Sequence, residues 1–309
     1  MPGSESGAPA LSLRAVRKSY GDHEVLRGVD LDVARGQVLG LLGRNGAGKS
    51  TLIEIMCGVR RADSGTVSVC GADPAKEGVG RRIGYAPQDL GVYPGLTVAQ
   101  NLSFYGQLEG VPRKRARART AEVMELLGLE DQSSQRAEHL SGGQKRRLHA
   151  GMAIMHQPEV VFMDEPTVGA DVEARSRILR AVRSLAEAGA AVVYTSHYLA
   201  EFEELNADIA ILDGGRVVVA DTLDRVVAEH ARASIALKFA HTPPPLNGWS
   251  TEDGWLRREG DIPNPGALIA EALVSPALRE RRLEDVRINQ AGLQSAYLAI
   301  VGEEEHDNA

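Results

Sequence analysis

The chain has 309 residues, of which 43% are hydrophobic and 25% are charged, and its formal net charge is −7. This composition is typical of a globular protein and excludes a disordered, collagen-like or disulfide-scaffold chain. The net acidity and the aromatic content of 4% also argue against a general nucleic-acid binder, which would need a basic face and stacking rings, so no nucleic-acid partner is expected.

The sequence also argues against export and against a membrane span. The first ten residues lack the basic and apolar regions of an export signal, and the two cysteines, Cys57 and Cys70, form no spaced framework. The longest stretch without charged residues, Leu90–Leu108, is interrupted by glycine, proline and amide side chains, which a bilayer interior would not accommodate cheaply. We therefore expect a chain in the cytoplasm.

The beginning of the chain shows three patterns in succession. Residues 1–10 are small and polar and are expected to form a disordered tail. From Leu11 to about Gln37 apolar and polar residues alternate, which predicts half-buried antiparallel strands. The continuous apolar run 38–42 predicts a fully buried strand, and a glycine-rich turn leads from it into a predicted helix over 49–57.

Strands and helices alternate in the next part of the chain. Apolar runs at 83–86, 160–163 and 192–195 predict buried strands, and residues 174–188 have helical spacing, so we expect a largely parallel sheet covered by helices. Between the first two of these strands the pattern is almost entirely helical. This predicts a helical subdomain over about residues 90–158.

The last third of the chain changes character. The apolar runs 209–212 and 216–219 flank an Asp-Gly-Gly turn and predict a β-hairpin. From residue 229 to 309 short strands and helices are separated by breakers such as the triple proline 243–245, which predicts a small accessory α+β domain. The acidic end, residues 303–305, is expected to be solvated.

The turn after residues 38–42 carries the most specific motif of the sequence. It fits the phosphate-binding loop pattern, in which two glycines are followed by lysine and a hydroxyl residue. In such a loop backbone N–H groups and the following helix N-terminus bind phosphate oxygens, Lys49 supplies a point charge, and Ser50 can ligate magnesium. The predicted nucleotide-binding residues are Gly43, Arg44, Asn45, Gly46, Ala47, Gly48, Lys49, Ser50 and Thr51.

Two adjacent carboxylates follow the apolar run 160–163. Because successive strand residues point to opposite sides, Asp164 and Glu165 are expected to face in different directions. Asp164 can then hold magnesium, usually through water, while Glu165 faces the γ-phosphate and polarises an attacking water. Together with the phosphate-binding loop, this pair predicts an ATPase that uses ATP and Mg²⁺.

A second phosphate-binding candidate lies inside the helical region. Leu140-Ser141-Gly142-Gly143-Gln144 precedes a predicted helix over 145–156 and combines backbone amides, a hydroxyl and a helix N-terminus. Taken in order from residue 11 to about 228, these motifs resemble the nucleotide-binding subunit of ATP-binding cassette (ABC) transporters. Further matches to that family are Tyr20, Gln88, Gly169-Ala170-Asp171 and His197.

The resemblance implies a fold and a set of roles. The fold is of the α/β class: a P-loop NTPase core over residues 11–228, with a mixed sheet made of an antiparallel β subdomain and a parallel core, and with an inserted helical subdomain. Tyr20 would stack on adenine, Gln88 would touch magnesium and the attacking water, and His197 would bind the γ-phosphate. The implied catalytic residues are Glu165, His197, Gln88 and Lys49, and the implied metal-binding residues are Ser50, Gln88 and Asp164.

The resemblance also implies partners. Ser141, Gly142, Gly143 and Gln144 would contact the ATP of the opposite subunit, and Asp171 would lie at the dimer interface, so a homodimer that encloses two MgATP is expected. A separate transmembrane permease would bind through the helical subdomain and the loop after Gln88. This partner would hold the chain at the inner face of the cell membrane.

Residues 163–169 and the last strand and helix, residues 283–287 and 292–302, resemble the corresponding parts of bacterial drug and antibiotic exporter ATPases. An exporter of drugs, antibiotics or other hydrophobic small molecules is therefore favoured over an importer ATPase, whose appendage would be a larger β-barrel. The motifs are also compatible with a soluble ATP-switched protein that acts on ribosomes or DNA, and with a regulatory module that binds ATP without hydrolysing it. The transported substrate is not indicated, since specificity lies largely in the membrane subunit.

Overall fold

The computed structural model describes residues 8–260, 262–279 and 281–302, and the chain divides into two compact units, Met1–Thr222 and Leu223–Ala309. Each unit has a hydrophobic core of its own. The tail predicted over residues 1–10 lies largely outside the described residues. Within its described part Ala10 is buried, and its carbonyl accepts a hydrogen bond from the N–H of Cys70. The acidic end 303–305 lies outside the described residues as well.

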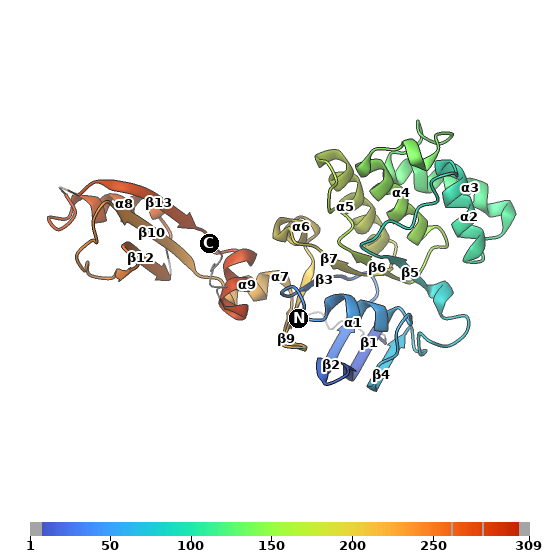
Figure 1. Cartoon of the computed structure of the whole chain (residues 1–309), viewed down its shortest axis with the longest axis horizontal. Coiled ribbons are helices and arrows are strands. Elements are labelled where there is room, and N and C mark those ends of the chain that lie inside the picture. Colours follow the sequence, from blue (N-terminus) through green and yellow to red (C-terminus); the bar gives the residue numbers. More distant parts are fainter. Residues whose placement is uncertain (1–7, 261, 280, 303–309) are drawn as a thin grey trace, which may run out of the picture. The chain divides into compact units, whose positions relative to one another are not determined.

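A six-stranded sheet of order β5-β6-β7-β3-β8-β9 forms the centre of the first unit (Figure 1). Neighbouring strands are parallel except for the antiparallel pair β8 and β9. Every residue of β3, β6 and β7 is buried, as expected for parallel strands covered on both faces. The strands are β3 (Val38–Leu42), β5 (Ile83–Ala86), β6 (Val160–Asp164), β7 (Ala191–Thr195), β8 (Asp208–Asp213) and β9 (Arg216–Asp221).

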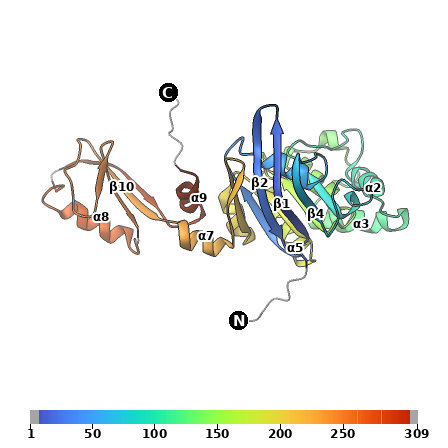
Figure 2. The ribbon, with the colours of Figure 1, turned by 90° about the horizontal axis from the view of Figure 1, so that it is seen from below.

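A second, antiparallel sheet of order β2-β1-β4 completes the mixed α/β architecture that the sequence predicts (Figure 2). Its strands are β1 (Leu11–Tyr20), β2 (His23–Val33) and β4 (Ser64–Val69). Helix α1 (Lys49–Met56) shares one core with both sheets. The sequence did not indicate β4, because only Val69 of this strand is buried and its pairing with β1 alone defines it.

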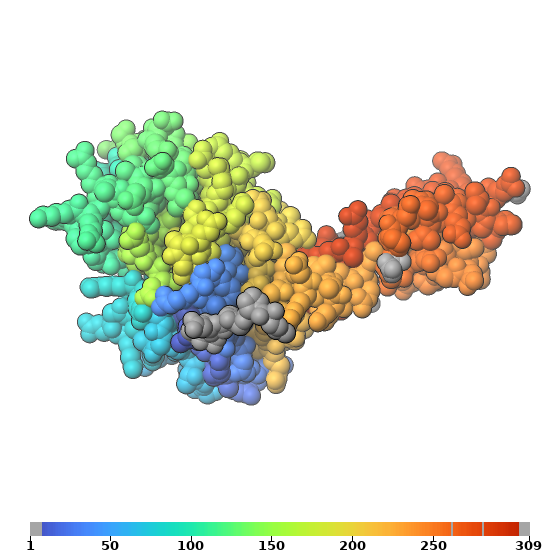
Figure 3. Space-filling view, turned by 180° about the vertical axis from the view of Figure 1, so that it is seen from behind, coloured from blue at the N-terminus to red at the C-terminus, as the bar shows by residue number. Residues whose placement is uncertain are grey.

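Helices α2 (Val98–Leu108), α3 (Arg113–Leu127) and α4 (Gly142–Ile154) form the region between β5 and β6, drawn in green on one side of the first unit in Figure 3. Two of them begin with a reciprocal capping box, in Thr97–Gln100 and in Ser141–Gln144. The helices α5 (Val172–Glu187) and α6 (Leu199–Leu205) follow β6 and β7, and short 3₁₀ helices span Gly80–Arg82 and Ala137–His139. The helical pattern predicted between these strands is therefore present.

The second unit is a four-stranded antiparallel sheet of order β11-β12-β10-β13 with three helices. Its core contains Ile235, Leu237 and Leu256 from the sheet and Ala272 from α8. The sequence places the start of the accessory domain at residue 229, whereas α7 packs against α9 within this unit. The elements are α7 (Leu223–His230), β10 (Ala233–Phe239), β11 (Ser250–Glu252), β12 (Trp255–Gly260), α8 (Pro265–Val274), β13 (Leu283–Asn289) and α9 (Leu293–Val301). Within the described parts of the chain, no helix combines the length and the apolarity needed to cross a bilayer.

Candidate nucleotide-binding and hydrolysis site

The carboxyl ends of four neighbouring strands meet at one edge of the six-stranded sheet. From there β3 leads into the Gly43–Thr51 loop, β5 into the segment with Gln88, β6 into Glu165, and β7 into His197. Parallel strands that end at one edge bring their following loops together, which is where open α/β sheets bind ligands. The topology therefore gathers residues that are far apart in the sequence.

Close packing fixes the phosphate-binding loop and explains two of its glycines. At Gly43 a side chain would place its Cβ atom 2.4 Å from the carbonyl oxygen of Leu212, too close for any residue but glycine. Gly48 has a φ of +103° immediately before α1, in the left-handed region that side chains rarely adopt. The backbone can thus turn sharply from β3 into the N-terminus of α1, where its N–H groups are available to an anion.

Lys49 starts α1, and its amine points back to the loop. Nζ donates hydrogen bonds to the carbonyl oxygens of Gly43 at 2.7 Å and Arg44 at 3.2 Å. Burial lowers the pKa of the Lys49 amine, while the charges of Glu165 and then Asp164 act to raise it. The amine of Lys49 therefore interacts electrostatically with the carboxylates of Asp164, at the end of β6, and Glu165, the next residue.

The carboxylates Asp164 and Glu165 are arranged by Thr195 at the end of β7. Thr195 Oγ1 donates to Asp164 Oδ1 at 2.6 Å and accepts from the backbone N–H of Glu165 at 2.9 Å. Strand alternation is not what orients Glu165: this residue lies beyond the end of β6 with a φ of +49°, so a left-handed backbone sets its direction. Sequence reasoning missed Thr195, although a polar residue closing an otherwise apolar strand was the available signal.

Glu165 contacts two of the other predicted catalytic residues. Oε1 of Glu165 lies 2.6 Å from Nε2 of His197, and Gln88 Nε2 donates to Glu165 Oε2 at 3.0 Å. Glu165 is buried, whereas the His197 side chain is half exposed. A buried carboxylate with a histidine on one oxygen and an amide on the other is arranged to orient a water molecule and accept its proton.

Arg146 joins this cluster to the helical region, and sequence reasoning missed it. Its Nη1 donates to the carbonyl oxygen of Gln88 at 2.5 Å, and its Nε donates to the carbonyl oxygen of Val168 at 2.9 Å. Burial lowers the pKa of Arg146, while Glu165 and then Asp89 oppose that shift. A side chain of α4 thus holds both the segment after β5 and the segment after β6.

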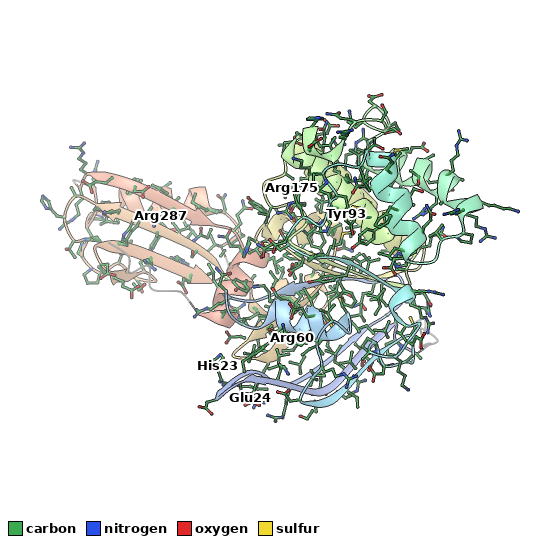
Figure 4. The ribbon with its side chains drawn as sticks, turned by 45° about the vertical axis from the view of Figure 1, so that its right-hand side comes forward. His23, Glu24, Arg60, Tyr93, Arg175 and Arg287 are labelled. Atoms are coloured by element: carbon green, nitrogen blue, oxygen red, sulfur yellow. The ribbon has the colours of Figure 1, made fainter. Side chains whose placement is uncertain are left out.

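Tyr20 lies at the end of β1, on the antiparallel sheet. Its ring is 42% exposed and has two cations beside it, Lys18 at 5.8 Å and Arg60 at 5.2 Å from the ring centroid. Arg60, labelled in Figure 4, follows α1 and also forms an ion pair with Glu54. Neither of these two cation contacts connects the Tyr20 ring to the phosphate-binding loop. Part of the ring remains exposed to solvent.

The Ser141-Gly142-Gly143-Gln144 segment differs from its predicted form. The helix was expected to start at Lys145, but Ser141 is the N-cap and both glycines lie in the first turn of α4. Ser141 Oγ accepts from the N–H of Gln144 at 3.2 Å, and Gln144 Oε1 accepts from the N–H of Ser141 at 2.9 Å. These two hydrogen bonds cap the N-terminus of α4, because each side chain accepts a hydrogen bond from the backbone N–H of the other residue.

The first turn of α4 packs against the start of α5. A Cβ atom added at Gly143 would lie 3.0 Å from Ala174 Cβ and 3.2 Å from Asp171 Oδ2. Asp171 is the N-cap of α5, and its Oδ1 accepts from the N–H of Ala174 at 2.8 Å. The structure therefore places Gly143 beside Asp171, and Ser141, the N-cap of the same helix, is exposed.

These residues fit a magnesium nucleotide. The glycine loop and the start of α1 offer backbone donors to phosphates, and Lys49 adds a positive charge. Asp164, whose second carboxylate oxygen is free of the Thr195 bond, and the hydroxyl of Ser50 are oxygen ligands of the kind Mg²⁺ takes alongside phosphates and water.

The fold and this site define a P-loop ATPase. The sequence profile of the ABC transporter family matches residues 26–168. The linearmycin resistance ATP-binding protein LnrL of Bacillus subtilis is 42% identical over 69% of each chain, and the daunorubicin resistance ATP-binding protein DrrA3 of Streptomyces coeruleorubidus is 35% identical over 96% of each chain. A solved ATP-binding subunit of an ABC transporter is 28% identical and covers 71% of this chain and 92% of that one, with a TM-score of 0.66.

The chain belongs to the ATP-binding subunits of the ABC transporter family. It is an ATPase most like the drug and antibiotic resistance ATP-binding proteins of this family, as the sequence predicted. The match to DrrA3 extends over the second unit as well as the first.

Proposed function

We propose that this chain hydrolyses MgATP as one half of a homodimer and thereby drives a separate membrane permease that exports drugs, antibiotics or other hydrophobic small molecules. The observation that carries the hydrolytic part is the contact of Glu165 with both His197 and Gln88. The resistance proteins to which the chain is similar support the exporting part.

Each residue of the site has a role in this proposal. Lys49 and the loop from Gly43 to Thr51 bind the β- and γ-phosphates, and Ser50, Asp164 and Gln88 face the magnesium ion. Bound Mg²⁺ neutralises charge on the phosphate oxygens. Glu165 orients the attacking water and accepts its proton, while His197 contacts the γ-phosphate and Tyr20 stacks on adenine. The exposed ring of Tyr20 and the buried carboxylate of Glu165 support these roles.

The dimer follows from the two phosphate-binding segments. The loop before α1 and the turn before α4 both present a helix N-terminus, and Gly143 in the first turn of α4 lies beside Asp171. In the proposed head-to-tail dimer Ser141, Gly142, Gly143 and Gln144 complete the ATP site of the opposite subunit, and Asp171 lies at the interface. Two shared nucleotides would then stabilise the dimer, and hydrolysis would remove that stabilisation.

The permease would bind an apolar surface beside Gln88. The coupling surface, defined as Leu90, Tyr93, Phe104 and Leu108, exposes between 37% and 63% of each side chain. The rings of Tyr93 and Phe104 meet edge to face with their centroids 5.2 Å apart, and Tyr93 is labelled in Figure 4. Exposed aromatic and aliphatic side chains gathered in one place are typical of a protein interface. The permease would hold the chain at the inner face of the membrane.

Affinity purification from the source cell tests this proposal. Tagged Glu165→Gln protein is incubated with ATP and gently solubilised membranes, and the proteins that co-purify are identified. We expect a protein with several membrane spans. Recovery of ribosomal or DNA-bound material alone would refute the transport assignment and support a soluble ATP-switched protein instead.

A double variant and a control variant test whether the permease binds the coupling surface. Phe104→Ser together with Leu108→Ser should reduce recovery of the membrane protein at least tenfold, in line with loss of central interface anchors, while ATP binding is kept. Val218→Ser on β9, which is 48% exposed, is the control and should not change recovery. Equal losses in both would show that the effect is not specific to the coupling surface.

A further inference from the structure

Glu201 is a buried charge that the proposed chemistry does not use. It lies on α6 with no exposed surface, yet it has three polar partners. Thr167 Oγ1 donates to its two oxygens at 2.9 and 3.1 Å, Tyr194 OH donates to Oε2 at 2.7 Å, and Arg175 Nε forms an ion pair with Oε1 at 3.0 Å. A buried carboxylate is tolerated only where such donors replace its water, so this arrangement is specific.

The partners of Glu201 come from two functional segments. Thr167 lies between Glu165 and Asp171, in the turn that leads from the hydrolytic carboxylate to the proposed dimer interface. Arg175 is in the first turn of α5, directly after the N-cap Asp171. Glu201 is therefore bonded to the interface turn, residues 166–171, at its middle and to the helix that this turn caps.

The second segment is the one that carries His197. Glu201 lies four residues after His197, near the start of α6, and Tyr194 lies three residues before His197, near the end of β7. The guanidinium of Arg175, labelled in Figure 4, lies 5.4 Å from the ring centroid of Tyr198, the next residue after His197. One direct contact to the His197 segment, from Tyr194, and two to the interface turn and its helix, from Thr167 and Arg175, thus converge on one carboxylate.

We propose that Glu201 is a positioning residue that couples the γ-phosphate-contacting segment around His197 to the dimer-interface turn 166–171. The inference rests on the roles proposed above for His197 and Asp171. The buried hydrogen bonds of Glu201 join the two segments directly, in addition to the contact of His197 with Glu165 immediately before the interface turn. A displacement of His197 by bound γ-phosphate is then transmitted to the surface that meets the second subunit.

ATP-driven dimerisation tests the coupling. The Glu201→Gln substitution keeps the volume of the side chain but removes the charge that faces Arg175 and replaces one acceptor oxygen by a donor. It is introduced into the Glu165→Gln protein, and the ATP concentration for half-maximal dimerisation is measured by analytical ultracentrifugation. Binding of a fluorescent ATP analogue to the monomer and the melting temperature are measured alongside.

We expect Glu201→Gln to raise the ATP concentration for half-maximal dimerisation about tenfold, as for a typical loss of coupling between sites, and to change monomer nucleotide affinity less than twofold. Thr167→Val should give a similar shift, and the double variant should shift no further, because both changes break the same contact. Glu204→Gln, on the same helix but in an exposed ion pair with Arg183, is the control and should behave as the parent.

Three outcomes would overturn the inference. The first is unchanged dimerisation in Glu201→Gln, and the second is additive effects of Glu201→Gln and Thr167→Val. The third is a loss of monomer ATP binding as large as the loss of dimerisation, because this result would show that Glu201 stabilises the fold in general. If the Glu201→Gln protein does not fold, the same measurements on Thr167→Val alone test the inference. Absence of ATP-dependent dimers in the Glu165→Gln parent is a different failure, because it refutes the proposed function itself.

Discussion

The hydroxyl of Thr195, at the end of β7, donates a 2.6 Å hydrogen bond to Oδ1 of Asp164, at the end of β6. The same oxygen accepts the backbone N–H of Glu165. One buried hydroxyl therefore fixes the carboxylate proposed to face magnesium and the residue proposed to activate water. The bond to Asp164 runs between neighbouring strands of the central sheet, and the bond to Glu165 reaches the first residue beyond β6.

Replacement of Thr195 by valine should lower kcat. Valine has the same shape but cannot donate to Asp164, and a buried hydrogen bond to a charged group is worth about 1.5–3 kcal/mol, which corresponds to a fall in rate of roughly tenfold to a hundredfold. Steady-state ATPase assays at varied ATP concentration separate kcat from KM. Thr195→Ser keeps the hydroxyl and should recover most of the rate. Failure of serine to do so would show that the hydroxyl is not the relevant feature.

Glu165→Gln should abolish turnover and stabilise an ATP-dependent dimer. Glutamine keeps the size of the side chain and one acceptor oxygen but cannot accept a proton from water, and loss of a general base typically costs about a hundredfold or more in rate. Phosphate release and sedimentation in the presence of ATP measure the two effects. Hydrolysis at the wild-type rate in this variant would contradict the assigned role.

Lys49→Ala should weaken ATP binding and turnover together. The amine donates to the loop that is proposed to cradle the phosphates, and loss of a charge-assisted contact to phosphate corresponds to at least about a tenfold loss of affinity. Equilibrium binding of ATP measures it directly. Lys76→Ala, which changes an exposed lysine outside the loop, is the control and should bind as the wild type. Undiminished affinity in Lys49→Ala would refute the phosphate site.

His149 should make the fold acid-sensitive. Burial first, and the charge of Arg146 second, lower the pKa of His149 from 6.5 to about 4. The unfolded chain therefore binds this proton between pH 6.5 and 4 while the folded chain does not, so stability is lost as the pH falls through that window. Between pH 7.5 and 5 the loss amounts to about 2 kcal/mol in the free energy of unfolding.

Urea unfolding of the wild type and of His149→Leu at these two pH values measures that difference. The leucine variant has no group to titrate at this position, so its stability should fall by about 2 kcal/mol less than that of the wild type over the same interval. His139→Leu changes an exposed histidine and should keep the acid sensitivity of the wild type. Equal pH dependence in the wild type and His149→Leu would show that His149 is not the responsible group.

Much of the fold could be predicted because its strands are chemically uniform. β3, β6 and β7 are continuous apolar runs, and the loop that follows β3 has a residue pattern with a direct physical reason. The start of β4 could not be predicted in this way, because most of its side chains are exposed and pairing with β1 defines the strand. Likewise the start of α4 at Gly142 depends on the reciprocal bonds between Ser141 and Gln144, which helix propensity does not report.

The sequence was sufficient to name the predicted site residues individually, but it did not identify the residues that hold them in position. The left-handed backbone of Glu165 and the hydroxyl of Thr195 are tertiary features, since each depends on a neighbouring strand. In the sequence alone, nothing distinguishes Glu201 from the other acidic residues of the same short amphipathic helix. Only the packing of α6 against α5 makes it a buried charge with partners from three other elements.

The separate core of residues 223–309 has a consequence for how such ATPases diversify. Among the described residues, the core that contains Ile235, Leu237, Leu256 and Ala272 is built from side chains of the second unit. Natural selection can therefore alter, exchange or discard the appendage while the hydrolytic machinery is conserved. Residues 223–309 could therefore be transferred as one piece to a cassette that lacks them, without redesign of the ATP site.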